Sequence, residues 1–79
     1  MIPNDIKLYR TKQKATQAEV SAATGIGRTN LSLMENGRLL PTPRQVQALV
    51  EYFGVTCHHL YSDKQLAAIF ENSEEEGEG

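Results

Sequence analysis

The sequence predicts a small all-α domain, and three kinds of local signal support this fold class. Two T-x-x-E/Q patterns begin at Thr16 and Thr42. Each marks a helix start, because the two side chains of such a pattern cap each other's backbone amides. Gly25 and Gly54 follow at helical distances, and glycine readily takes the left-handed conformation that ends a helix. Between these signals, apolar residues recur at intervals of three or four, and the 79 residues are expected to form one domain.

A first helix is expected over about residues 5–13, before the first of these patterns. Asn4 is placed to cap this helix, and Ile6 and Tyr9 lie three residues apart on one of its faces. That face is therefore expected to turn toward the core.

The most specific pattern in the chain is a pair of short helices. The first runs from about Gln17 to Gly25, and the second covers residues 28–35 and ends at the turn-prone pair Asn36–Gly37. Two short helices joined by a tight, glycine-containing turn are the layout of a helix-turn-helix, whose second helix enters the major groove of DNA. The pattern therefore favours double-stranded DNA as a partner.

Three further helices are expected in the second half of the chain. One covers residues 43–53 and ends at Gly54, and a short one follows Thr56 and extends to about residue 61. A third capping pattern, from Ser62 to Gln65, precedes an apolar run. Residues 62–71 are therefore predicted to form a short sixth helix beyond the domain of residues 1–61.

The net charge of −2 hides an uneven distribution. Residues 71–79 contain five acidic residues and no basic one, so residues 1–70 hold eight basic and five acidic residues, a net charge of +3. Residues 72–79 are expected to be a disordered acidic tail. The excess of basic residues in the rest of the chain is modest for a protein that binds DNA.

Other classes of function have little support in the sequence. Cys57 is the single cysteine, which excludes an internal disulfide and fits a reducing cytoplasm. There is no apolar run of membrane-spanning length and no apolar leader. Cys57, His58 and His59 are adjacent on a helix, about 100° apart, and do not converge on one metal ion. We predict no catalytic residue, metal or cofactor, and hence no enzyme.

The chain resembles the Cro/phage-repressor (XRE-type) helix-turn-helix regulators over about residues 5–61. The matching positions are Arg10, Thr16, Gln17, Glu19, Val20, Gly25, Ile26, Arg28, Leu31, Ser32, Met34, Glu35, Asn36, Gly37, Pro41, Thr42, Pro43, Leu49, Phe53, Gly54, Val55, Thr56, Leu60 and Tyr61. The resemblance implies a lambda-repressor-like domain of five helices. At Lys14 the chain departs from the glycine that the family usually has, so either the turn there tolerates a side chain or the helix ends differently.

The resemblance also implies roles for three polar residues. Gln17 is expected to contact a DNA phosphate and to brace the recognition helix; otherwise it is a solvated polar residue at a helix start. Arg10 and Glu35 are expected to form the family's partly buried ion pair, which links the first helix to the third, and direct phosphate binding by Arg10 is the alternative.

Four residues of the helix over 28–35 are candidates for contacts with bases: Arg28, Thr29, Ser32 and Leu33. Arg28 can hold a guanine or, alternatively, only a phosphate. Thr29 can bond a base or touch a thymine methyl group. Leu33 replaces a residue that is commonly polar, and it either packs on a thymine methyl group or is an ordinary surface residue.

The candidates for phosphate contacts, besides Gln17, are Asn30, Asn36, Gly37, Arg38 and Arg44. The loop after the recognition helix is expected to present backbone amides and positive charge to a DNA strand. For Asn36 and Gly37 the alternative is that the pair only stops the helix. Leu66, Ile69 and Phe70 either cover the core or form a dimer contact.

The function predicted from the sequence is a sequence-specific transcriptional regulator, a repressor that binds an inverted repeat as a homodimer. The alternative is a protein-interaction module on the same fold, such as an antitoxin that binds a toxin or an accessory subunit with weak DNA binding. The acidic tail either keeps the protein soluble or competes with DNA phosphates for the basic face.

Overall fold

The computed structural model describes residues 1–71, which form six α-helices and contain no strand. The predicted all-α fold, with a sixth helix after the first five, is confirmed. The helices are α1 (Ile6–Lys12), α2 (Gln17–Thr24), α3 (Arg28–Glu35), α4 (Pro43–Phe53), α5 (Cys57–Leu60) and α6 (Asp63–Glu71). None of these helices is long and apolar enough to cross a membrane.

The two capping boxes form as the sequence predicts. The Thr16 hydroxyl accepts a hydrogen bond from the Glu19 amide at 3.0 Å, and the Glu19 carboxylate accepts from the Thr16 amide at 2.8 Å. Thr42 and Gln45 make the same reciprocal pair at the start of α4. Both helices then end at a left-handed glycine, Gly25 for α2 and Gly54 for α4. Local sequence therefore sets the ends of these two helices.

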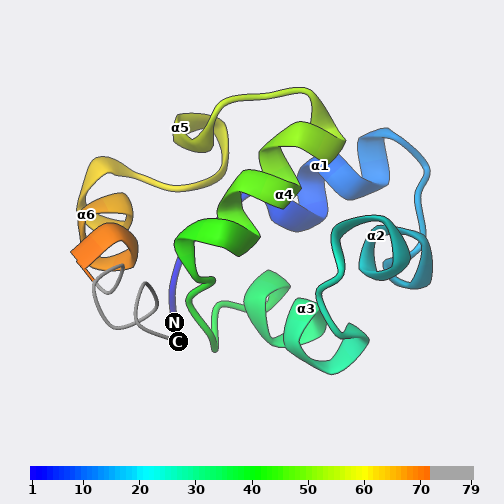
Figure 1. Ribbon diagram of the computed structural model, residues 1–79, viewed down its shortest axis with the longest axis horizontal. Coiled ribbons are helices and arrows are strands. Elements are labelled where there is room, and N and C mark those ends of the chain that lie inside the picture. Colours follow the sequence, from blue (N-terminus) through cyan, green and yellow to red (C-terminus); the bar gives the residue numbers. More distant parts are fainter. Residues whose placement is uncertain (72–79) are drawn as a thin grey trace.

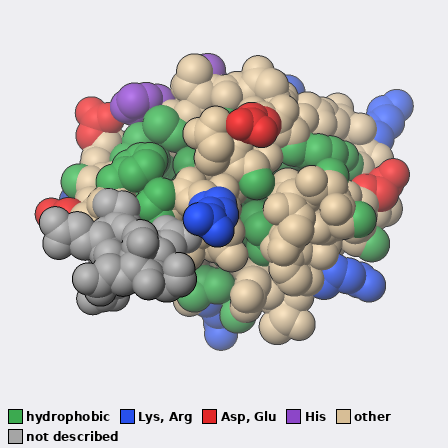
Figure 2. Space-filling model, in the orientation of Figure 1, with side chains coloured by type: hydrophobic (Ala, Val, Ile, Leu, Met, Phe, Trp, Pro, Cys, Tyr) green, Lys and Arg blue, Asp and Glu red, His purple; other side chains and the backbone are tan. Residues whose placement is uncertain are grey.

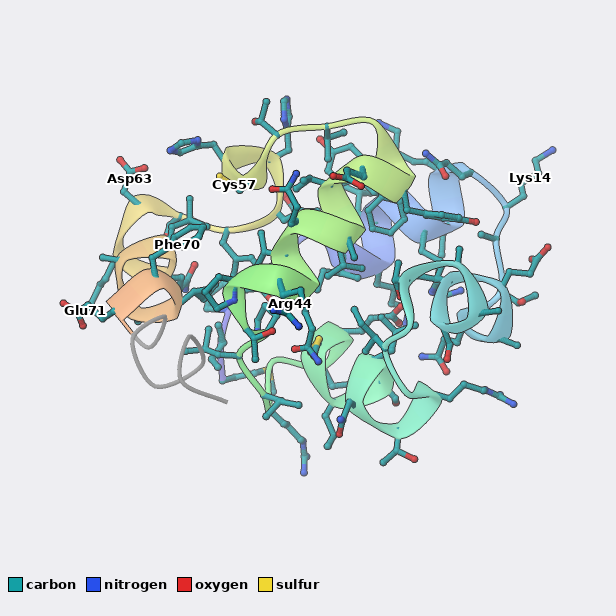
Figure 3. All side chains as sticks on the ribbon, viewed as in Figure 1. Lys14, Arg44, Cys57, Asp63, Phe70 and Glu71 are labelled. Carbon is teal, nitrogen blue, oxygen red and sulfur yellow. The ribbon has the colours of Figure 1, made fainter. Side chains whose placement is uncertain are left out.

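The turn between α1 and α2 contains Lys14 in a left-handed conformation, with a φ of +57°. It is the one residue other than glycine with a positive φ in the part of the chain that the structure describes. Its side chain is exposed and points away from the domain, at the end of the molecule opposite Phe70 and Glu71 (Figure 3). The turn thus keeps the backbone shape that suits glycine and accepts a side chain in its place.

The helices surround one hydrophobic core. In Figure 1, α4 crosses the middle of the molecule in front of α1. The helices α2 and α3 lie toward one end, and α5 and α6 lie toward the other. Each helix contributes at least one buried apolar side chain. The core residues are Ile6, Val20, Ile26, Leu31, Met34, Val46, Leu49, Phe53, Leu60, Tyr61, Leu66 and Ile69. A single shared core therefore fixes α2 and α3 relative to the rest of the domain.

The sixth helix is part of this core. Leu66 and Ile69 are only 6% and 0% exposed, so they cover the core of a single chain and are not available at its surface for a second copy. Phe70 remains 45% exposed. Of the three residues considered for a dimer contact, Phe70 is thus the accessible one. The predicted disordered tail, residues 72–79, lies outside the described residues.

Candidate nucleic-acid interface

Three helices meet at a partly buried ion pair. Arg10 of α1 donates to Glu35 of α3 through Nε at 2.6 Å and Nη2 at 3.1 Å, and it donates to the Ala15 carbonyl through Nη1 at 3.0 Å. The two charged side chains are 14% and 2% exposed. The hydrogen bond to Glu35 raises the pKa of the Arg10 guanidinium. The ion pair therefore fastens the end of α3 to α1.

Gln17, the first residue of α2, belongs to the same cluster. Its Nε2 donates to Glu35 Oε1 at 3.1 Å. Because a carboxylate only accepts hydrogen bonds, the amide nitrogen of Gln17 must face Glu35. The second amide hydrogen and the amide oxygen remain available. Glu35 thus fixes which end of the Gln17 amide points outward.

A hollow of about 460 Å³ lies beside Gln17 and is lined by Gln17, Arg28, Thr29, Ser32 and Leu33. These are the four residues that the sequence suggests for base contacts, together with one suggested for a phosphate. Arg28 and Thr29 are exposed, and Ser32 and Leu33 are half-buried. The other side of α3 is buried through Leu31 and Met34. The structure therefore brings the base-contact candidates together on the outer side of a firmly packed helix.

The end of α3 corrects one expectation about the loop that follows. The Gly37 amide donates to the Met34 carbonyl at 3.1 Å, and the Arg38 amide donates to the Leu33 carbonyl at 2.8 Å, a Schellman cap. Gly37 is buried, with a φ of +74°. Neither amide is free, so the amides of Gly37 and Arg38 are not available to a DNA strand. Gly37, suggested for a phosphate contact, instead shapes the end of the helix.

The remaining phosphate candidates carry their polar groups on side chains. Asn30, Asn36, Arg38 and Arg44 are all exposed. Asn36 also donates to the Ser32 carbonyl at 2.9 Å, which leaves it one further amide hydrogen. Arg44, on the first turn of α4, projects from the face seen in Figure 3, and a basic group lies at the centre of the same face in Figure 2. None of these four side chains lines the hollow, and Asn36 and Arg38 lie beside residues 1–4 instead.

Some contacts at the site have no signal in the sequence. The Gln17–Glu35 bond joins residues 18 positions apart, and Asn4 reaches the Met34 carbonyl across 30 positions. The sequence suggests Asn4 as the cap of the first helix, but Asp5 occupies the N-cap position of α1, and Asn4 Oδ1 accepts from the Ile6 amide at 3.1 Å from one residue earlier. Its second role, as a donor to α3, depends on the packing of distant segments.

The two histidines make short-range contacts at the two ends of α5. His59 accepts through Nδ1 from the Thr56 amide at 3.1 Å, so it caps α5. His58 lies 3.2 Å from the Asp63 carboxylate, and Cys57 lies 3.8 Å from the other ring nitrogen of His58. Within residues 1–71 there is no group of three histidine, cysteine or acidic side chains placed to hold a metal ion.

Comparison with known proteins agrees with the geometry. A family model described as helix-turn-helix matches residues 6–60, which is more than half of the chain and spans α1 to α5. No curated protein matches the chain. The matched range contains the α2–α3 pair, the hollow along α3 and the Arg10–Glu35 ion pair. The chain belongs to the Cro/phage-repressor-like, XRE-type family of helix-turn-helix DNA-binding regulators.

Proposed function

We propose that this protein is a sequence-specific regulator of transcription that places α3 in the major groove of double-stranded DNA. The observation that carries the proposal is the hollow lined by Gln17 and the outer residues of α3. Its polar groups have the chemistry that reads base edges, and α3 is held by a buried ion pair and two core residues. The family is one of DNA-binding regulators, so the proposal assigns no reaction and no cofactor.

In this proposal, Arg28, Thr29, Ser32 and Leu33 contact bases. Arg28 and Thr29 stand on the first turn of α3, which is the part of a recognition helix that meets base edges first. An arginine there pairs with O6 and N7 of guanine. Leu33, half-buried at the wall of the hollow, offers an apolar surface to a thymine methyl group.

Gln17 and four exposed polar or basic side chains outside the hollow contact the phosphates. The free amide hydrogen of Gln17 serves one strand at the start of α2, while Asn30, Asn36, Arg38 and Arg44 supply further contacts. Such contacts set the register and orientation of the protein on the duplex, whereas the base contacts set its sequence preference.

The regulator would act as a repressor in the cytoplasm and bind an inverted repeat as a homodimer. A two-fold dimer places its recognition helices in successive major grooves, about 34–36 Å apart. Phe70 is the exposed apolar residue of α6, at the end of the molecule away from α2 and α3 (Figures 1 and 3). Apolar side chains also gather between α5 and α6 in Figure 2. A contact between copies there would leave α3 free for DNA.

The test is selection and sequencing of fragments from random genomic DNA at about 150 mM salt, where non-specific attraction to phosphates is weakened. We expect an enriched inverted repeat with half-sites about 10 base pairs apart. The same selection with Arg28→Ala should lose or change the preference at one position of each half-site. If wild-type protein enriches no sequence, the proposal of sequence-specific regulation is wrong.

A second candidate function is favoured by the exposed Phe70 and the modest positive charge of residues 1–70. A protein-interaction module, such as an antitoxin that binds a toxin, would use an apolar surface of this kind. Weak binding to DNA that depends only on salt, together with a stable complex that is lost in Phe70→Ser, would support this function over the first.

A further inference from the structure

The first four residues lie against the loop that follows α3. In Figure 1 the N-terminal segment runs beside the connection between α3 and α4. The Ile2 amide donates to the Gly37 carbonyl at 2.8 Å, and Asn4 Nδ2 donates to the Met34 carbonyl at 2.8 Å. Residues 1–4 are therefore bonded to the last turn of α3 and to the residue just before Arg38.

Asn4 uses its whole carboxamide group in this arrangement. Besides its bond to Met34, Nδ2 donates to the Ile2 carbonyl at 3.1 Å, and Oδ1 accepts from the Ile6 amide at 3.1 Å. Both amide hydrogens and the oxygen are thus engaged. One side chain ties the start of α1, the N-terminal segment and the end of α3 together.

Gly37 shows how closely the segment packs. A Cβ atom at this position would lie 2.6 Å from Met1 Cγ, 2.7 Å from the Ile2 oxygen and 2.8 Å from the Ile2 nitrogen. The left-handed φ already favours glycine here, and the close approach of the segment is a second, independent reason. Residues 1 and 2 therefore pack so closely on Gly37 that they leave no room for a side chain there.

These bonds restrain the backbone on the N-terminal side of Arg38. The peptide that joins Gly37 to Arg38 is held at both of its polar groups, because its carbonyl accepts from Ile2 and its amide donates to Leu33. Leu33 itself lines the hollow along α3. A long exposed side chain that starts from an ordered backbone loses less conformational entropy when it binds.

We propose that residues 1–4, through Asn4 and the Ile2 amide, position Arg38 for its contact with a DNA phosphate. The proposal rests on the proposed function, since Arg38 needs a DNA strand to contact. It makes Asn4 a positioning residue that touches no DNA itself. It also adds an N-terminal element to an interface otherwise built from α2, α3 and the start of α4.

The test is a double-mutant cycle between Asn4→Ser and Arg38→Ala. Serine leaves the net charge unchanged and still caps the Ile6 amide, but it is too short to keep the bond to Met34. The probe is the duplex enriched in the selection above, with affinity measured over a range of salt concentrations and at a temperature where thermal melts show every variant folded. Arg38→Ala should lower the slope of log affinity against log salt by about one.

We expect Asn4→Ser to weaken binding about five-fold, the size of one lost hydrogen bond, and to lower the salt slope. In the Arg38→Ala background it should change neither quantity. Gln13→Ser is the matched control, because Gln13 donates to the Phe53 carbonyl at 3.1 Å and also ties α1 to the end of a helix. The control should lower stability to a similar extent and leave affinity and slope unchanged.

Two other outcomes would decide against the proposal. If the losses from Asn4→Ser and Arg38→Ala multiply, Asn4 does not act through Arg38. If Asn4→Ser leaves affinity unchanged in the wild-type background, the segment has no role in binding DNA. Absence of any binding by the wild-type protein would instead overturn the proposed function, so the two failures are distinguishable.

Discussion

The carboxylate of Glu35 joins side chains from two other helices. It accepts two hydrogen bonds from Arg10 and one from Gln17, and it is almost entirely buried. A buried charge is tolerated only when such partners satisfy it, so the cluster is expensive to break by removing one member. Its second effect is to fix the orientation of the Gln17 amide, because one amide hydrogen is committed to the carboxylate.

Substitution of Glu35 separates the effect of the cluster on stability from its effect on the Gln17 amide. Glu35→Gln keeps the shape, but its amide donates as well as accepts, so it no longer fixes the orientation of the Gln17 amide for a phosphate. We expect weaker binding to DNA and a free energy of unfolding lower by up to about 3–5 kcal/mol. In a Gln17→Ala background, Glu35→Gln should have no further effect on affinity.

Arg10→Met is the matched control for this cycle. It also breaks the ion pair, but it leaves the Glu35 carboxylate to hold Gln17. The affinity of the folded protein should then change little. Equal losses of affinity in Glu35→Gln and Arg10→Met would show that the cluster acts on DNA binding only through stability.

Tyr61 places a polar group, its hydroxyl, in the hydrophobic core. Its side chain is 3% exposed, and its hydroxyl has no hydrogen-bond partner among the residues that the structure describes. A buried hydroxyl without a partner costs free energy. We expect Tyr61→Phe to raise the free energy of unfolding by about 1 kcal/mol, measured by urea denaturation. Tyr52→Phe, at a half-buried position, is the control and should change it little.

The same residue makes stability depend on alkaline pH. Burial raises the pKa of the Tyr61 hydroxyl above its ordinary value. The unfolded chain releases this proton near pH 10, whereas the folded chain keeps it. Above about pH 10 the unfolded state therefore binds fewer protons, and the free energy of unfolding falls by up to about 1.4 kcal/mol per pH unit. Tyr61→Phe should remove this part of the decline; an identical decline in both proteins would contradict it.

At the scale of helices, the sequence predicts what depends on neighbouring residues. The capping boxes at Thr16 and Thr42 and the stops at Gly25 and Gly54 are local signals, and the ends of α2 and α4 follow from them. The amides after α3 are different. The sequence shows that Gly37 ends the helix but not that the cap consumes its amide, so the expectation of a phosphate contact there fails.

Contacts between distant residues are the part that the sequence does not predict. The bond from Gln17 to Glu35 and the bonds from residues 1–4 to the end of α3 depend on how the helices pack. The residues of α6 illustrate the same limit. Their spacing indicates an apolar face, but only packing decides that Leu66 and Ile69 are buried and that Phe70 is exposed.

Replacement of Lys14 tests the conformation of the turn between α1 and α2. Lys14 has a positive φ, which costs a residue with a Cβ atom about 1 kcal/mol relative to glycine. The greater freedom of glycine in the unfolded chain offsets part of this gain. We expect Lys14→Gly to raise the free energy of unfolding by up to about 1 kcal/mol in a denaturant titration. A loss of stability would show that the Lys14 side chain contributes more than the strain costs.

At the scale of the whole molecule, the two ends of the domain have different surfaces. The end with α2 and α3 carries the hollow and most of the polar candidates for DNA contacts, and the end with α6 carries the exposed Phe70 (Figure 1). This separation lets one copy contact DNA and a second copy at the same time. The domain is small, so burial of further apolar surface between copies would also add to its stability.

Substitution of Phe70 tests the proposed dimer. Phe70→Ser removes the exposed ring and leaves Leu66 and Ile69 in the core, so the melting temperature at low protein concentration should change little. We expect sedimentation to show a shift toward monomer, and binding to the inverted repeat to weaken more than binding to one half-site. Unchanged sedimentation and unchanged binding to both sites would place the contact between copies elsewhere.

The proposed function requires the outer side of α3, with Gln17 at its edge, to meet the DNA. The most direct measurement is a titration of the labelled protein with the selected duplex, followed by amide NMR spectra. We expect the largest shifts at Gln17, residues 28–33 and residues 36–38, with small shifts in α5 and most of α6. Shifts concentrated around Phe70, with α3 unaffected, would contradict the account and make the apolar end of the molecule the binding surface.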